Sequence, residues 1–198
     1  MTWWWLLLSA LGAALLGASI VAARQPVIGP RERRVFHAVN GLPDWLYPVL
    51  WLPMQLGNLV VGTAAGLVVA FVDRDLVVAI GAVLAAMLKL VAERIIRREM
   101  ADALTVRQRP GTSEVGAILR GADVPSSGPS FPSGHVILVA VIGSVVAPNV
   151  AVGWAWVPFA CTLLVMLGRV YVGAHNPLDV TAGLGAGLLL GGLLAVFI

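Results

Sequence analysis

Long apolar segments recur through this chain, and they limit the folds open to it. A helix needs about 20 apolar residues to cross the roughly 30 Å of hydrocarbon in a bilayer. With 59% hydrophobic and 12% charged residues, the sequence is too apolar for a soluble domain. We therefore expect an all-α integral membrane protein. The six predicted spans are Trp3–Ala23, Leu56–Val72, Leu76–Ala92, Ser133–Asn149, Val150–Gly168 and Val180–Ile198.

Two other segments complete the predicted fold. A polar connector, "RQPVIGPRERRVFHAVNGLPD", follows the first span, and the Trp- and Pro-rich piece Trp45–Met54 comes after it. We interpret that piece as an interfacial or half-inserted helix with Asp44 as its N-cap. The prediction is a six-transmembrane-helix bundle with an additional interfacial helix, forming one domain over residues 1–198. The first apolar segment has no basic residues before it and is long for a signal peptide, so we expect it to be retained.

Charge and cysteine content narrow the classes of partner. The net charge of +3 arises from basic residues clustered in short connectors between apolar segments, which indicates contact with anionic lipid and not with nucleic acid. The single cysteine, Cys161, excludes an internal disulfide. Gly183, Gly187 and Gly191 are spaced about one helical turn apart, which predicts a close-packing face on the last helix.

The order of the spans places the polar connectors. Six helices that alternate in direction put the first, third and fifth connectors on one side of the bilayer. The third connector carries Arg109 and the motif Pro132–His135, and the fifth carries Arg169 and His175. All the candidate chemistry is therefore expected on one face.

The residues on that face suit an anionic phosphate. Arginine presents a planar fork of donors that matches phosphate oxygens, and its charge persists at any relevant pH. Ser133 comes just before a predicted helix start, where the amides of Gly134 and His135 point outward and the helix dipole favours an anion. The candidate site residues are His135, His175, Asp179, Arg109, Arg169, Ser133 and Gly134.

The sequence around His175 predicts its orientation. Asn176 is a good N-cap and Pro177 a good first helical residue, so Asp179 falls in the first turn of the last helix. A carboxylate there can hold one ring nitrogen of His175 and leave the other as nucleophile. A His-Asp-His metal site is the competing chemical interpretation, which is disfavoured because the neighbouring arginines repel a cation. His37 has no such context, and we expect it at the surface.

These motifs resemble the type 2 phosphatidic acid phosphatase superfamily of lipid phosphatases, which is related to vanadium haloperoxidases. That family's signature is Lys, six residues, Arg-Pro; then Pro-Ser-Gly-His; then Ser-Arg, five residues, His, three residues, Asp. The second part is complete here at Pro132–His135. Arg169, His175 and Asp179 have the spacing of the third part, and Arg109-Pro110 matches the end of the first. The resemblance extends from the second apolar segment to the last helix.

The resemblance implies a mechanism and roles for these residues. His175 is expected to attack phosphorus and form a phosphohistidine, with Asp179 orienting it, and His135 to protonate the departing alcohol and then activate water. The side chains of Arg109, Arg169 and Ser133 and the Gly134 amide are expected to hold the phosphoryl oxygens. The resemblance implies no metal or other cofactor.

Two positions depart from the family signature. Gly168 replaces the Ser of the third part, which removes a hydroxyl, and Asp102 occupies the position of the first-part Lys. The cation that stands in for this Lys is then one of four residues. The candidates are Lys89, Arg94, Arg97 and Arg107.

The distribution of arginine predicts the sidedness of the site. Eleven arginines lie in connectors on the catalytic face, against Arg74 on the opposite side. Without Arg109 and Arg169 the ratio is still nine to one, so the positive-inside rule predicts an active site on the cytoplasmic side of the cell membrane. The eleven are Arg24, Arg31, Arg33, Arg34, Arg94, Arg97, Arg98, Arg107, Arg109, Arg120 and Arg169.

Two functions from different classes fit the sequence. The first is an enzyme that dephosphorylates a lipid, either a polyprenyl phosphate or diphosphate or a glycerolipid phosphate. The second is a non-catalytic binder or carrier of lipid phosphate, which the absent first-part Lys motivates. Release of phosphate, abolished by His175→Ala, distinguishes them.

Overall fold

The computed structural model describes the backbone of residues 3–25, 27–99 and 107–196, and the side chains of these residues except 92, 93 and 95–99. Every regular element in this part of the chain is a helix, as the apolar segments predict. The elements are α1 Trp3–Ala23, α2 Pro30–Asn40, α3 Leu46–Met54, the 3-10 turn η1 Gln55–Gly57, α4 Leu59–Asp73, α5 Leu76–Glu99, α6 Pro110–Ser113, α7 Gly134–Val146, η2 Ala147–Asn149, η3 Val152–Trp154, α8 Val157–Tyr171 and α9 Pro177–Ala195.

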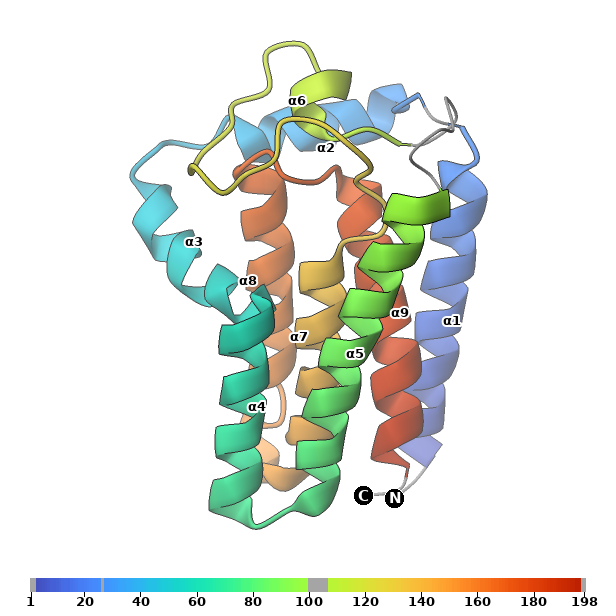
Figure 1. The fold of residues 1–198 in the computed structure, drawn as a ribbon, viewed down its shortest axis with the longest axis vertical. Helices are drawn as coiled ribbons and strands as arrows, with labels where there is room; N and C mark the ends of the chain where they lie inside the picture. The colour runs from blue at the N-terminus through green and yellow to red at the C-terminus, as the bar shows by residue number, and fades with distance from the viewer. Residues whose placement is uncertain (1–2, 26, 100–106, 197–198) are drawn as a thin grey trace.

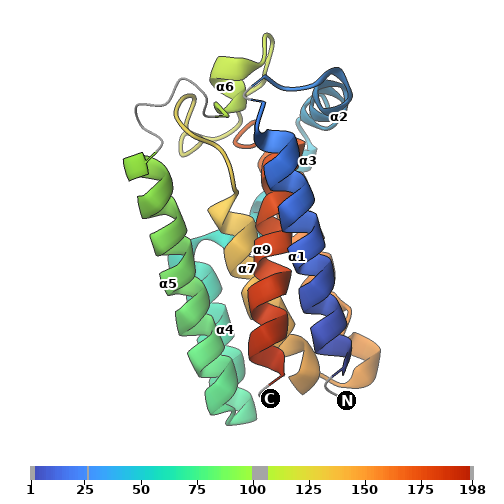
Figure 2. The ribbon, with the colours of Figure 1, turned by 90° about the vertical axis from the view of Figure 1, so that its right-hand side faces the viewer.

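The long helices form a bundle around α7, which packs on α9, α5, α8 and α4, and α9 packs most extensively on α1 and α7 (Figure 1). Both chain ends lie at one end of the bundle, together with the α4–α5 turn (Figure 2). The opposite end carries α2, α6 and the loop that leads into α7 (Figure 1). This second end is the one to which the sequence assigns the site.

Glycines allow α9 to approach α7 closely. A Cβ atom on Gly183 would lie 2.7 Å from the carbonyl oxygen of Ser133, and one on Gly191 would lie 2.5 Å from the Ser144 Cβ. A Cβ on Gly187 would overlap Ala140. The predicted close-packing face is confirmed, and it sets α9 directly against the helix that carries His135.

Several helices have the length and composition to cross a bilayer. Among the described residues these are α1, Val152–Tyr171 and α9. The pair Leu46–Gly57 and Leu59–Asp73 makes a fourth candidate, bent by 70°. Two shorter apolar helices, Leu76–Val91 and Gly134–Asn149, complete the bundle.

The bend between α3 and α4 differs from the predicted arrangement, in which the Trp-rich helix stands apart from the second span. Asn58 explains the break, because its backbone is extended and its side chain accepts hydrogen bonds from the amides of Val60 and Val61. A new helix therefore starts directly after η1. The predicted N-cap of α3 was wrong: no side chain caps this helix, and the Asp44 carboxylate instead accepts a hydrogen bond from Arg120 at 2.9 Å.

The polar connector after α1 contains a helix that the sequence analysis missed. α2 starts with Pro30 at its first position and lies across the end of the bundle (Figure 1). Asn40, at its last position, is buried and donates to the carbonyl oxygens of Ile118 and Tyr171. α2 is therefore attached to both the α6–α7 loop and the end of α8.

Candidate active site

The sequence-predicted residues meet at the end of the bundle that carries α2. A cavity of about 390 Å³ there is lined by Arg109, Gly134, His135, Arg169 and His175, among others. These residues come from parts of the chain that are far apart in sequence. Arg109 precedes α6, Gly134 and His135 are the first two residues of α7, and Arg169 lies in the last turn of α8. His175 lies in the short segment between α8 and α9.

His175 is held by a backbone carbonyl. Its side chain is buried, and Nδ1 lies 2.8 Å from the carbonyl oxygen of Ser130. A carbonyl oxygen can only accept, so Nδ1 carries the proton and donates it. The other nitrogen, Nε2, is then unprotonated and has a lone pair to offer.

The surroundings of His175 keep its ring neutral. Burial lowers its pKa well below the usual 6.5, and the positive charges of Arg169, Arg109 and Lys89 lower it further. The hydrogen bond to Ser130 acts in the opposite direction and is outweighed. The neutral imidazole is the form that can act as a nucleophile.

Asp179 does not hold the imidazole as predicted. Its Oδ2 lies 3.9 Å from Nδ1 of His175, which is too far for a hydrogen bond. That oxygen instead accepts from the backbone N–H of Asn176 at 2.8 Å, within the N-terminal turn of α9. The direct prediction failed because a backbone carbonyl, which leaves no trace in a motif, occupies the place beside Nδ1.

Arg107 and Glu32 complete the surroundings of Asp179. Arg107 is buried and donates from Nε to Asp179 Oδ1 at 3.1 Å, while its Nη2 lies 2.5 Å from Glu32. Glu32, on α2, also accepts from the backbone N–H of Leu178 at 2.9 Å. The sequence analysis did not identify Glu32, and no spacing rule links α2 to the start of α9.

The walls of the cavity carry donors suited to an anion. Arg109 Nη1 donates to the carbonyl oxygen of Ala174 at 2.8 Å, which fixes the guanidinium beside His175. Arg169 is only 6% exposed, and its Nε has no hydrogen-bond partner in the described part of the chain. The Ser133 hydroxyl is also buried without such a partner among the described residues, although Ser133 adjoins the lining residue Gly134 and does not itself line the cavity. Ser133 is the N-cap of α7, whose first amides lack acceptors within their own helix.

Among the candidates whose side chains the structure describes, Lys89 is the one whose positive charge acts on His175. Lys89 is buried on α5, and its ammonium donates to the carbonyl oxygen of Gly57 at 2.8 Å. Arg107 is engaged by Asp179 and Glu32, and Arg94 is exposed. The side chain of Arg97, like residue Asp102, lies outside the described residues.

The two remaining sequence expectations concern Gly168 and His37. A Cβ atom at Gly168 would overlap the Met54 side chain of α3, so the serine of the family signature would require that side chain to move. His37 is exposed on α2, as expected, with Nε2 3.5 Å from Glu114. Within the described residues, no three His, Cys, Asp or Glu side chains group closely enough to hold a metal ion.

One charged residue that lines the cavity was missed. Asp123 is exposed at the rim of the cavity, in the loop between α6 and α7. A carboxylate in a loop of Gly, Pro and Ser has no distinguishing pattern, so the sequence offered no signal for it.

Two solved structures share the fold of this chain. The crystal structure of Aquifex aeolicus LpxE aligns with a TM-score of 0.68 and 23% identity, covering 81% of this chain and 92% of that one. The Bacillus subtilis PAP2-type phosphatidylglycerolphosphate phosphatase aligns with a TM-score of 0.64 and 21% identity, covering 94% of this chain and 95% of that one.

Sequence comparison identifies the family. An undecaprenyl-diphosphatase from Sulfolobus acidocaldarius is 44% identical over 55 residues, so the match spans about a quarter of that curated relative, 26% of its length. The profile of the PAP2 superfamily matches residues 76–198, which contain every cavity residue named above. With well over half of its length matched, the chain belongs to the PAP2 superfamily.

Proposed function

We propose that this protein is an integral membrane lipid phosphatase that hydrolyses a phosphomonoester or diphosphate of a lipid through a phosphohistidine intermediate. The observation that carries the proposal is the shared cavity. A neutral, oriented His175 faces the same space as His135, and Arg109 and Arg169 line that space beside them. Membership of the PAP2 superfamily and the fold of two solved phosphatases support the same reaction class.

In the first step, Nε2 of His175 attacks the phosphorus atom and the bond from phosphorus to the lipid oxygen breaks. The proton stays on Nδ1, whose N–H group donates a hydrogen bond to the carbonyl oxygen of Ser130. Because Nε2 carries no proton, the imidazole needs no base to activate it. His135 gives a proton to the departing oxygen. Arg109, Arg169, Ser133 and the Gly134 amide stabilise the charge on the phosphoryl oxygens, the main task in phosphoryl transfer.

In the second step, the now neutral His135 takes a proton from water, and that water attacks the phosphohistidine. The phosphorus to nitrogen bond breaks, which restores His175 and releases phosphate. Asp179 contributes by holding the turn that carries Asn176 and by pairing with Arg107. We assign to Lys89 the role of the first-signature cation, because its charge acts on His175 from α5. The reaction calls on no metal or cofactor.

The substrate is a lipid phosphate whose hydrocarbon part remains in the bilayer. The names of the relatives support two substrate classes: polyprenyl diphosphates and monophosphates, as for undecaprenyl-diphosphatase, and glycerolipid phosphates, as for phosphatidylglycerolphosphate phosphatase. A phosphate tethered to such a chain can be reached only at the membrane edge, where the cavity lies.

We also propose that the chain is a single domain of six membrane spans. The bent α3–α4 pair and the shorter apolar segments Leu76–Val91 and Gly134–Asn149 add three spans to α1, Val152–Tyr171 and α9. α2 then lies along the membrane surface in place of the predicted interfacial helix. Basic residues at this end include the exposed Arg24, Arg31 and Arg34, which favours a cytoplasmic active site in the cell membrane.

Phosphate release by the purified protein tests the enzyme against the carrier. The wild-type chain is expected to release phosphate from a short-chain lipid phosphate in detergent, and His175→Ala to lower kcat by about 10³-fold or more. His37→Ala is the matched control, because this histidine is exposed on α2. Binding of the lipid without release by the wild-type chain would establish the non-catalytic carrier instead.

A further inference from the structure

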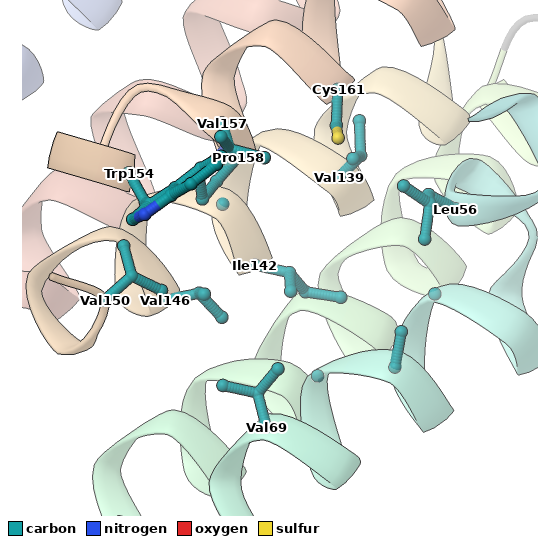
Figure 3. A pocket seen from close by; sticks show the side chains of 14 residues that line it. Leu56, Val69, Val139, Ile142, Val146, Val150, Trp154, Val157, Pro158 and Cys161 are labelled. Carbon is teal, nitrogen blue, oxygen red and sulfur yellow. The ribbon is translucent and has the colours of Figure 1, made fainter. Parts of the chain in front are cut away.

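A second cavity lies beside the candidate active site and has a different character. It measures about 320 Å³ and lies between α4, α7 and α8, where apolar side chains from the three helices face one another (Figure 3). None of the described residues that line it is charged. For comparison, an apolar cavity of about 150 Å³ accommodates a benzene ring, so this one has room for roughly a dozen carbon atoms.

One face of α7 connects this cavity to the catalytic histidine. His135 stands at the start of the helix, and Val139, Ile142 and Val146 follow at intervals of three or four residues. Residues with this spacing lie along the same side of a helix. The last three line the cavity, so it continues the His135 side of α7 for about 16 Å away from the catalytic end.

The 3-10 turn η1 marks the end of the cavity that is nearest the active site. Leu56 lines the cavity, and the next residue, Gly57, packs on His135. A Cβ atom on Gly57 would lie only 2.8 Å from the Cβ of His135. At the far end the cavity reaches the surface beside Trp154, which is 64% exposed.

We propose that this cavity binds the hydrocarbon chain of the substrate, next to the phosphate that His175 attacks. The inference rests on the proposed function, and it adds a second binding site on the other side of η1. Hydrocarbon gains little by moving from the bilayer into an apolar cavity. The cavity therefore acts by orienting the substrate and not by increasing its affinity for the protein. We expect this orientation to raise kcat/KM for substrates with long hydrocarbon chains.

Paired substitutions on α4 test this role. Ala65 lines the cavity, whereas its neighbour Ala64 is exposed on the outer side of the same helix. Ala65→Phe is expected to lower kcat/KM at least about 10-fold for a long-chain lipid phosphate, since misplaced reacting groups are costly. Its activity on water-soluble p-nitrophenyl phosphate stays at the wild-type level, which also shows that the variant is folded. Ala64→Phe changes neither activity.

The inference is overturned if Ala65→Phe reduces activity equally on the two substrates, or if Ala64→Phe has the same effect as Ala65→Phe. If the wild-type chain hydrolyses neither substrate, the proposed function fails, and binding of the chain must be measured without turnover.

Cys161 supplies that second measurement. It is the single cysteine of the sequence, and it lines the cavity from α8. Alkylation of the unmodified protein by N-ethylmaleimide, followed by intact mass, is expected to slow at least about 10-fold when a long-chain lipid phosphate saturates the protein. A short-chain analogue at equal saturation protects little. Equal alkylation rates with the two lipids would contradict binding of the hydrocarbon chain in this cavity, whether or not the protein turns over.

Discussion

At the residue scale, the chemistry depends on the protonation state of His175. The ring is buried, and three positive charges act on it, so its pKa is lowered well below 6.5. Lowering the pKa means that the folded protein binds this proton only at a more acidic pH. Neutral His175, and with it the nucleophile, is therefore retained through the range in which an ordinary histidine becomes charged.

Nuclear magnetic resonance can test this directly, because the chain contains only three histidines. We expect the His175 imidazole to remain neutral as the pH falls through 6.5, and its signal is identified by its absence from the spectrum of His175→Ala. A His175 signal that titrates at the ordinary value would contradict the electrostatic account of the site.

Lys89 is the second residue on which the account makes a prediction. Lys89→Met removes a buried charge that acts on His175, and we expect kcat/KM to fall by about 10²-fold or more. Arg94→Gln on the same helix is the control, because its side chain is exposed. Similar losses for the two variants would show that general charge, and not the placement of Lys89, matters.

Residues differ in how far the sequence could predict their surroundings. The N-terminal turn of α9 was predictable, since Asn176 and Pro177 have strong positional preferences. The hydrogen-bond partner of His175, the carbonyl oxygen of Ser130, was not predictable, because every residue has a backbone carbonyl and no sequence pattern marks this one. The position of Lys89 depends on the path of α5 past η1, which no local pattern records.

At the element scale, the close packing of α9 on α7 holds in place the helix that carries His135. Gly187→Ala is expected to destabilise the protein by about 1–3 kcal/mol, because the new methyl group would overlap Ala140. Gly17→Ala in α1 is the control, as nothing lies within 4 Å of its added Cβ. Thermal unfolding in detergent measures the difference, and equal stability of the two variants would contradict this packing.

Helices with a long apolar sequence were predicted better than short or polar ones. Long apolar segments gave both ends of α1, the start of α5 and each end of α9 to within three residues, because only a helix satisfies its backbone groups in hydrocarbon. The charged end of α5 extends seven residues beyond the predicted span. α2 was missed, since its 11 residues are mostly polar and its stability depends on contacts with distant loops. The bend between α3 and α4 arises from the cap at Asn58, which is easily read as part of one continuous apolar stretch.

At the scale of the whole molecule, the alternation of helix direction accounts for the meeting of distant residues. The termini and the α4–α5 turn lie at one end, and the cavity lies at the other (Figure 1). This arrangement could be inferred from span count alone. The lining of the cavity and the packing of α2 across this end of the bundle could not, because they depend on tertiary contacts.

Sidedness is a prediction at the same scale. In a Cys161→Ala background, Arg31→Cys is expected to resist a membrane-impermeant thiol reagent in intact cells and to react after lysis. Asp73→Cys, in the α4–α5 turn at the opposite end, should react in intact cells. The reverse pattern would place the active site on the outer face.

The central claim is that His175 becomes phosphorylated in the cavity it shares with His135. The most direct measurement uses His135→Ala with p-nitrophenyl phosphate, whose leaving group needs no proton, so the first step proceeds while hydrolysis of the intermediate is slowed. We predict a stoichiometric burst of p-nitrophenolate and, by mass spectrometry after an alkaline quench, a phosphoryl group on His175. A phosphoryl group on another residue, or a burst that persists in the His135→Ala, His175→Ala double variant, would contradict the account.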